Sequence, residues 1–266
     1  MMDQIRTSTD DIWAMLHGLE RAAGLSGMEQ PVVRALAELF TPLADQVSID
    51  AFGNLTATRY GKNAERSLML SAHSDEVGGV VTAVTPDGFL RFQPVGIVSA
   101  AVLPATRVRI NGSIPGVVVC PPGHADQGKA GGPKADLVDI GAQSSQEAAQ
   151  WGVEPGSGIT FDSPRIRLAN SRLVMGRALD NHIGCVELIK TFERLQSVEL
   201  PITVHAVVTV QEEIGMRGAR MAASRLCPNL AIALDTVPLD DTPLNSLPHA
   251  PFHLGAGPVI QLWEGK

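Results

Sequence analysis

The stretch ITVHAVVTVQEEIGMRGA, Ile202 to Ala219, decides how the sequence folds. Its first half is β-branched and almost uniformly apolar, which is typical of a strand buried on both faces. Two adjacent carboxylates, Glu212 and Glu213, end this run, and the glycines that follow them indicate a turn into a helix. A buried strand that ends on two acids is unusual, and it indicates a functional site at that edge of a sheet.

Apolar runs with strand and helix periodicity alternate on both sides of this stretch. The alternation predicts an α/β fold with a mostly parallel sheet flanked by helices. Ser26 is expected to cap the second helix, with Pro31 in its first turn. The expected elements are two helices after Asp10 and Ser26, a hairpin over 47–60 turning at Gly53 and Asn54, a strand over 67–72, helices over 180–196 and 215–226, and a strand over 229–235.

Between residues 76 and 168 the pattern changes to short apolar runs broken by glycine and proline. Regular short strands with frequent turn residues predict a small β-rich barrel or sandwich. One short helix is expected after Ser144, and the stretch GHADQGKAGGPK over 123–134 is interpreted as a mobile loop. The span 76–168 is therefore predicted to be an inserted domain, with 1–75 and 169–266 forming one discontinuous α/β domain.

Composition excludes several classes of partner. The chain has 266 residues and a formal net charge of −7, and its basic residues are scattered, so neither nucleic acid nor anionic lipid is an expected partner. The sequence contains no run of about 18 apolar residues, the length that a membrane span requires. Acids near the N-terminus argue against a secretory signal, so a cytoplasmic location is expected. Three cysteines without a CxxC pair do not suggest a thiolate zinc site.

Acidic and histidine side chains stand at the ends of four expected elements. In open α/β sheets the carboxyl ends of the strands line the ligand crevice, so these side chains are expected to converge. Crowded carboxylates raise one another's pKa, and a divalent cation relieves that conflict. Imidazole and carboxylates without thiolates suit zinc, cobalt or manganese, and their number suits two ions that share a carboxylate. The residues concerned are His73, Asp75, Asp180, Glu212, Glu213 and Asp235.

Roles follow from spacing along the chain. Asp75, two residues from His73 in an extended segment, can accept a hydrogen bond from the ring nitrogen that does not bind metal. Neighbouring side chains of an extended segment point to opposite sides, so Glu213 is assigned to metal and Glu212 to the attacking water as general base. Taken singly, each residue has an ordinary interpretation as a structural histidine, a helix cap or a turn former, but their coincidence favours a site.

Several stretches resemble the tetrahedral (TET) metallo-aminopeptidases, a family that includes glutamyl and deblocking aminopeptidases and proteins labelled endoglucanase M. The most specific is QEEIGMRGA, and the others are SGME, AHSDEVGG, LVDIGAQSSQEAAQWGVEPG, GRALDNHIG and AIALD. The resemblance implies a zinc-exopeptidase-like catalytic domain interrupted by a dimerisation domain over 76–168. It also implies dimers that assemble into a tetrahedral dodecamer and an enzyme that removes N-terminal residues from short peptides.

The resemblance also implies a set of metal ligands, and this chain differs from the family at two points that bear on that set. Family members commonly have Arg where this chain has His182, and they continue beyond the last residue here to a late histidine that binds the second metal. One alternative is therefore a protein that keeps the scaffold but has a weak second site and little peptidase activity; another is a deacylase or carboxypeptidase on the same scaffold. The implied roles are His73, Asp180 and Asp235 on one metal, Asp180 bridging, Glu213 on the second, Glu212 as base, and Asp75 orienting His73.

Overall fold

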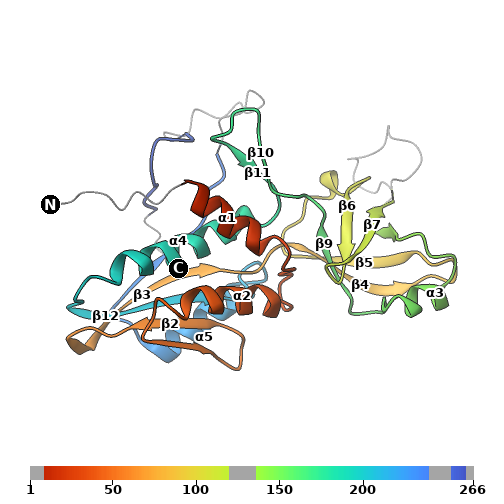
Figure 1. The fold of residues 1–266 in the computed structure, drawn as a ribbon. Coiled ribbons are helices and arrows are strands. Elements are labelled where there is room, and N and C mark those ends of the chain that lie inside the picture. Colours follow the sequence, from red (N-terminus) through yellow and green to blue (C-terminus); the bar gives the residue numbers. More distant parts are fainter. Residues whose placement is uncertain (1–8, 120–135, 240–252, 262–266) are drawn as a thin grey trace. The chain divides into compact units, whose positions relative to one another are not determined.

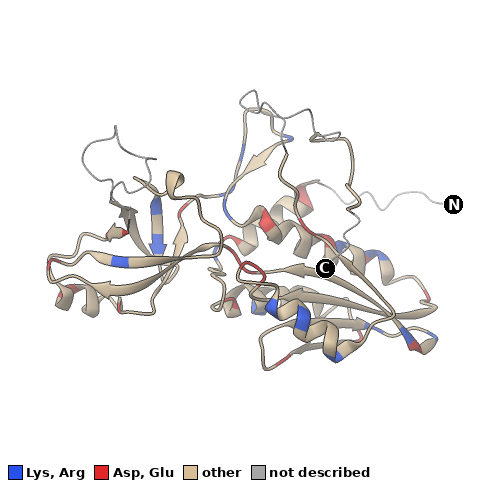
Figure 2. Cartoon of the chain, turned by 180° about the vertical axis from the view of Figure 1, so that it is seen from behind, with Lys and Arg blue, Asp and Glu red and all other residues tan. Residues whose placement is uncertain are grey.

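The computed structural model describes residues 9–119, 136–239 and 253–261. The chain divides into two compact units, residues 1–235 and 236–266, and the elements below belong to the first. The loop expected over 123–134 lies outside the described residues. Within the described part of the chain, no helix combines the length and apolar composition needed to cross a membrane. Lys and Arg residues are distributed over several elements (Figure 2).

One part of this unit is built on a mixed five-stranded sheet in the order β1-β2-β12-β3-β13 (Figure 1). β12 pairs in parallel with β3 and antiparallel with β2, while β13 pairs in parallel with β3. The α/β class is therefore confirmed, and the sheet is mixed because β2 pairs antiparallel with both β1 and β12. The short connection between β1 and β2 permits only antiparallel pairing of those two strands. The strands are β1 (Gln46–Ile49), β2 (Leu55–Arg59), β3 (Asn63–His73), β12 (Ile202–Thr209) and β13 (Leu230–Ala233).

The β1–β2 hairpin turns where the sequence predicted. The Asp50 carboxylate accepts hydrogen bonds from the backbone amides of Phe52, Gly53 and Asn54, each 2.9 Å long. Gly53 has a φ of +108°, which side-chain-bearing residues rarely adopt. The turn thus depends on one aspartate that satisfies the loop amides and one glycine that allows the reversal.

Helices cover both faces of the sheet (Figure 1). Apolar side chains of α1, α2 and α4 share one buried cluster with β2, β3 and β12, whereas Ala222 of α5 packs with Met69 and Val207 in another. Because neighbouring strand residues point to opposite faces, α5 lies on the face away from the other three helices. The helices are α1 (Thr9–Leu19), α2 (Gln30–Phe40), α4 (Leu179–Leu195) and α5 (Arg217–Leu226).

The expected cap of α2 is wrong. Glu29, not Ser26, occupies the N-cap position, and its side chain makes no capping hydrogen bond. The Met28 amide donates to the Leu25 carbonyl, so the chain turns before the helix begins and Ser26 lies away from the free helix amides. Pro31 sits in the first turn as expected, while Ser26 donates to a buried carboxylate of the candidate site described below.

A closed six-stranded barrel confirms the expected small β-rich unit (Figure 1). Its strands follow the order β4-β5-β8-β7-β6-β9 with antiparallel pairing throughout. Ser144 caps the short helix α3 (Ser145–Gln150) by accepting a hydrogen bond from the Glu147 amide. The barrel strands are β4 (Gly78–Val84), β5 (Leu90–Val95), β6 (Arg107–Ile110), β7 (Ile114–Val118), β8 (Leu137–Asp139) and β9 (Gly158–Phe161).

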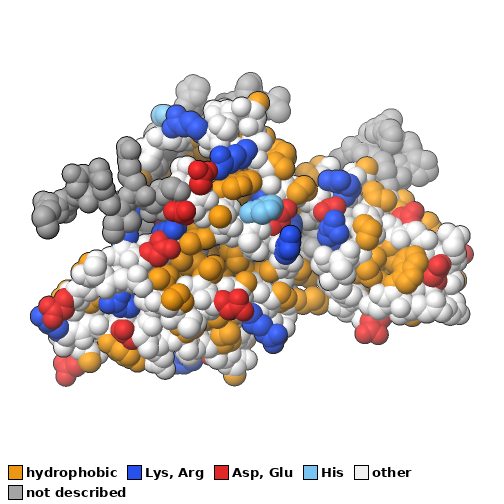
Figure 3. Space-filling model, in the orientation of Figure 1, with side chains coloured by type: hydrophobic (Ala, Val, Ile, Leu, Met, Phe, Trp, Pro, Cys, Tyr) orange, Lys and Arg blue, Asp and Glu red, His pale blue; other side chains and the backbone are white. Residues whose placement is uncertain are grey.

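A two-stranded hairpin follows the barrel in sequence. It consists of β10 (Ile166–Arg167) and β11 (Val174–Met175), which pair antiparallel. The short 3-10 helix η1 (Ala100–Val102) lies between β5 and β6 in sequence. Hydrophobic side chains reach the surface over both the barrel and the sheet-and-helix part (Figure 3).

Candidate metal centre

The carboxyl ends of three neighbouring strands meet at one edge of the sheet. The register pairs Thr209 of β12 with His73 of β3, and the Ser74 amide donates to the Thr209 carbonyl at 2.9 Å. On the other side of β3, Ala233 of β13 pairs with Ser71, which brings Asp235, two residues further on, beside His73. Parallel pairing thus produces the convergence that the sequence predicted.

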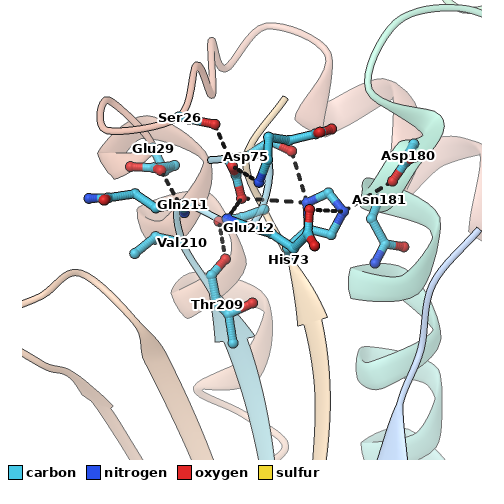
Figure 4. A network of polar contacts seen from close by, with 12 residues as sticks. Ser26, Glu29, His73, Asp75, Asp180, Asn181, Thr209, Val210, Gln211 and Glu212 are labelled. Atoms are coloured by element: carbon cyan, nitrogen blue, oxygen red, sulfur yellow. Dashed lines mark hydrogen bonds and ion pairs between the residues drawn. The ribbon is translucent and has the colours of Figure 1, made fainter. Parts of the chain in front are cut away.

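His73 is the centre of this group (Figure 4). Its ring is 3% exposed, and its Nε2 atom lies 3.0 Å from Asp180 Oδ1, 3.7 Å from Asp235 Oδ1 and 4.0 Å from Glu212 Oε2. Asp180 reaches the group from the start of α4. The structure therefore gathers acids from three separate elements around one imidazole.

Asp75 contacts both the histidine and the loop after β12. The His73 Nδ1 atom lies 3.1 Å from the Asp75 carbonyl and 3.4 Å from its Oδ1 atom. The buried Asp75 carboxylate accepts hydrogen bonds from Ser26 Oγ (2.5 Å), the Glu212 amide (2.9 Å) and the Glu213 amide (3.1 Å). Burial raises the pKa of Asp75, but these donors and His73 outweigh burial and hold the pKa below its usual value.

The two glutamates lie in a turn instead of an extended segment. β12 ends at Thr209, and Gln211 has a left-handed φ of +55°. One oxygen each of Glu212 and Glu213 and one ring nitrogen of His73 lie within 4.8 Å of one another. The expectation that the two carboxylates point to opposite sides is therefore wrong, because the left-handed residue ends the alternation of an extended chain.

The donor atoms fit a divalent cation. His73, Asp180 and Asp235 form one group with ligand atoms within 4.8 Å of one another, and His73, Glu212 and Glu213 form a second. Neither group contains a cysteine, and imidazole with carboxylate oxygens suits zinc, cobalt or manganese. His73 is common to both groups.

The shifted pKa values of His73 and Glu213 also favour a bound cation. Burial lowers the pKa of His73, but hydrogen bonds to Asp180, Asp235 and Asp75 outweigh it and raise the pKa to about 12. Burial raises the pKa of Glu213 to about 7, a shift that His73 opposes and the neighbouring acids increase. The acids therefore require positive charge, which a bound cation would supply in place of the histidine proton.

His182 lies behind this group as a fully buried structural residue. Arg165 Nη2 donates to its Nδ1 atom at 2.6 Å, and its Nε2 atom donates to the Ser74 carbonyl at 3.2 Å. Burial, together with the positive charge of Arg165, lowers the pKa of His182 to about 3. The neutral ring therefore supports the backbone next to His73, and it belongs to neither group of candidate ligands in the described chain.

Sequence reasoning missed four residues that support the site. Arg165 and Arg177 flank the β10–β11 hairpin; Arg165 is buried against α4, and Arg177 forms an ion pair with Glu76. No local pattern distinguishes these arginines from solvated ones. Ser26 and Glu29 fall within the SGME stretch, which resembles the family, but Ser26 was expected only to cap a helix and no role was expected for Glu29.

A cavity of about 680 Å³ opens beside the acids. Asp180 and Glu213 form part of its wall, together with the apolar side chains Val77, Ile97 and Phe161. The cavity volume lies in the range of small-molecule and peptide sites, so it offers room for a substrate next to the candidate metal ligands.

Comparison with known proteins identifies the family. A family model described as M42 glutamyl aminopeptidase matches residues 53–266, well over half of the sequence. The chain belongs to the M42 glutamyl aminopeptidase family. This M42 peptidase is 34% identical over 259 residues to the lysyl aminopeptidase of Pyrococcus furiosus, covering 94% of the present chain and 73% of that protein.

Solved structures agree with this assignment. A TET aminopeptidase from the archaeon Thaumarchaeota archaeon SCGC AB-539-E09 superposes with a TM-score of 0.82 at 33% identity, covering 88% of this M42 peptidase and 68% of the other chain. The Pyrococcus horikoshii TET1 peptidase gives a TM-score of 0.75 at 31% identity, covering 86% and 73% respectively, and can assemble into a tetrahedron or a large octahedral shell. The predicted TET family and the prediction of a peptidase enzyme are confirmed.

Proposed function

We propose that this M42 peptidase removes N-terminal residues from short peptides with the help of divalent metal ions. The convergence of His73 with acids from three elements carries the proposal. Names of relatives support an aminopeptidase reaction, since lysyl and glutamyl aminopeptidases are both similar to this chain. The cavity beside the acids gives the substrate a place to bind.

His73, Asp180 and Asp235 would hold one ion, and Asp180 together with Glu213 would hold a second. Bound divalent ions supply Lewis-acid polarisation of the scissile carbonyl and make water a better nucleophile at neutral pH. Asp75 orients His73 and holds the loop that carries the glutamates, through its contacts with the ring and with two loop amides. Oxygen and nitrogen donors at these positions suit zinc or cobalt, and manganese as well.

Glu212 acts as the general base in this proposal. Its carboxylate stands 4.0 Å from His73 Nε2 with a side chain 30% exposed, so it can reach both water and substrate. Burial, opposed by His73 and reinforced by Asp235, raises the pKa of Glu212 above its usual value, which makes the carboxylate a stronger base. Glu212 takes a proton from the attacking water and delivers it to the leaving amine.

Hydrolysis of substrates with a free amino terminus is the expected activity. The metal-loaded chain is tested on aminoacyl p-nitroanilides and on the same compounds with an N-acetyl group. Release from the free amines alone supports the aminopeptidase. Release of acetate from the N-acetyl compounds would favour a deacylase, and release of C-terminal residues from peptides would favour a carboxypeptidase.

A homo-oligomer in which the barrel makes the dimer contact is also part of the proposal. TET1 of P. horikoshii assembles into closed shells. Several large apolar side chains of the barrel region are exposed, including Ile97 (93%), Val102 (58%) and Trp151 (42%). Exposed apolar side chains of this size commonly mark contact surfaces.

Replacing residues 76–168 by a short linker is expected to give monomers that retain the candidate metal ligands. The reason is that the linker removes the apolar side chains assigned to the dimer contact. Light scattering after size-exclusion chromatography, with the parent at the same concentration, measures the result. An oligomer of unchanged subunit number would contradict the role given to the barrel.

A further inference from the structure

A buried carboxylate outside the candidate ligand set holds the loop that carries Glu212. Glu29 is 5% exposed, and its Oε1 atom accepts hydrogen bonds from the Gly27 amide (2.7 Å) and from the Gln211 amide (3.0 Å) (Figure 4). Gln211 immediately precedes Glu212 and is 182 residues away from Glu29 in sequence. The contact therefore ties the start of α2 to the loop after β12.

The backbone at Gln211 needs such a contact. Its φ of +55° is left-handed, a conformation that is unfavourable for a residue with a side chain. A hydrogen bond from its amide to an ionised carboxylate is stronger than one to a neutral acceptor, so Glu29 stabilises this conformation. The reversal at Gln211 is also what turns both glutamate carboxylates toward His73.

Glu29 completes a row of amide contacts. Asp75 accepts from the amides of Glu212 and Glu213, and Glu29 accepts from the preceding amide, that of Gln211. Two buried carboxylates thus hold three consecutive backbone amides. The main chain at Glu212 is therefore held by two hydrogen bonds: the preceding amide, that of Gln211, donates to Glu29, and the amide of Glu212 itself donates to Asp75.

The arrangement is electrostatically unfavourable for Glu29 itself. Burial raises the pKa of Glu29, the amides of Gly27 and Gln211 partly offset that effect, and repulsion from Asp75 adds to it. A neutral side chain at this position would avoid both desolvation and repulsion. A requirement for a strong acceptor at the Gln211 amide explains why an acid is found here.

We propose that Glu29 is a positioning residue of the peptidase reaction, which holds Gln211 in its left-handed conformation so that the Glu212 carboxylate faces the attacking water. The proposal rests on the general-base role proposed for Glu212. Glu29 does not line the cavity beside the acids. Loss of the Glu29 carboxylate is therefore expected to affect kcat more than KM. kcat depends on the orientation of the Glu212 carboxylate, whereas KM depends on substrate contacts.

The test compares the metal-loaded full chain with Glu29→Ala and Glu29→Gln, with Glu38→Ala on the exposed side of the same helix as control. Glu29→Ala is expected to accelerate hydrogen–deuterium exchange in a peptide covering 209–216 by about 10- to 100-fold, the worth of one charge-assisted hydrogen bond. Its kcat is expected to fall by a similar factor with KM near that of the parent. Glu29→Gln keeps an oxygen acceptor but loses the charge, so both of its effects should lie between those of the parent and of Glu29→Ala, and Glu38→Ala should match the parent.

Two results would overturn the positioning role. One is a Glu29→Ala variant with parental kcat and parental exchange over 209–216. The other is a loss of kcat accompanied by faster exchange throughout β3, β12 and α4, which would show a general loss of stability. If Glu29→Ala does not fold, Glu29→Asp decides, because its shorter side chain cannot serve both amides; unchanged exchange and kcat in that variant would refute the role.

Glu212→Gln in the same assay separates failure of this inference from failure of the proposed function. An inactive Glu212→Gln together with a fully active Glu29→Ala overturns the positioning role alone. A fully active Glu212→Gln overturns the proposed function and the positioning role together.

Discussion

Replacing Glu212 by Gln is expected to lower kcat by about 10²- to 10⁴-fold, the usual contribution of a general base, while the metal content stays near that of the parent. The side-chain amide of the variant cannot accept the proton of the attacking water. Metal binding should persist, because Glu212 is not assigned as a metal ligand. The backbone amide at position 212 still donates to Asp75, so the loop keeps its position. Steady-state kinetics and metal analysis of the same preparations measure the two effects.

Glu213→Gln is the matched comparison, because the neighbouring residue differs only in its assigned role. It is expected to lose metal as well as activity. Equal metal loss in the two variants would show that the roles of Glu212 and Glu213 are exchanged or shared.

Replacing His73 by Ala is expected to reduce metal binding to background and to abolish hydrolysis. Without His73, the first proposed ion would keep only Asp180 and Asp235, and the second would have only Asp180 and Glu213. A tightly held zinc ion generally needs three or four protein ligands. Metal content after gel filtration and residual activity measure the effect.

His205→Ala provides the control for this variant. His205 lies on β12, one strand away from His73, and its Nδ1 atom contacts Thr58 Oγ1 at 2.9 Å instead of the acids. The control should bind metal as the parent does. Parental metal content in His73→Ala would contradict the proposed centre.

The sequence predicted the convergence because it follows from strand pairing alone. The runs that end at His73, Glu212 and Asp235 carry strand periodicity, and parallel neighbours bring their carboxyl ends to the same edge. The hairpin over 47–60 was equally predictable, since its turn depends on local residues.

The sequence could not predict the parts of the site that depend on backbone reversals or distant partners. The left-handed conformation of Gln211 has no local signal, since this residue is neither glycine nor asparagine. The prediction therefore extended the alternation of strand side chains through Glu212 and Glu213, although the chain already turns there. Ser26 satisfied the local rules of a helix cap, but its hydroxyl donates to Asp75, 49 residues away.

Arg165 and His182 illustrate the same limit. The two residues are 17 positions apart in sequence, and their contact depends on Arg165, just before β10, lying beside the start of α4. A polar residue in a loop is usually solvated, so nothing local indicated that this arginine is buried. The buried pair also explains why His182 supports the site without being one of its candidate ligands.

Peptide hydrolysis is expected to depend on metal ions bound by the acids around His73. The most direct test removes metal from the full chain with a chelator, and then restores zinc or cobalt stepwise while bound metal and release of the N-terminal residue from a short peptide are measured together. Hydrolysis is expected to disappear in the metal-free chain and to return in proportion to the bound ions. Undiminished hydrolysis by the metal-free chain would contradict it.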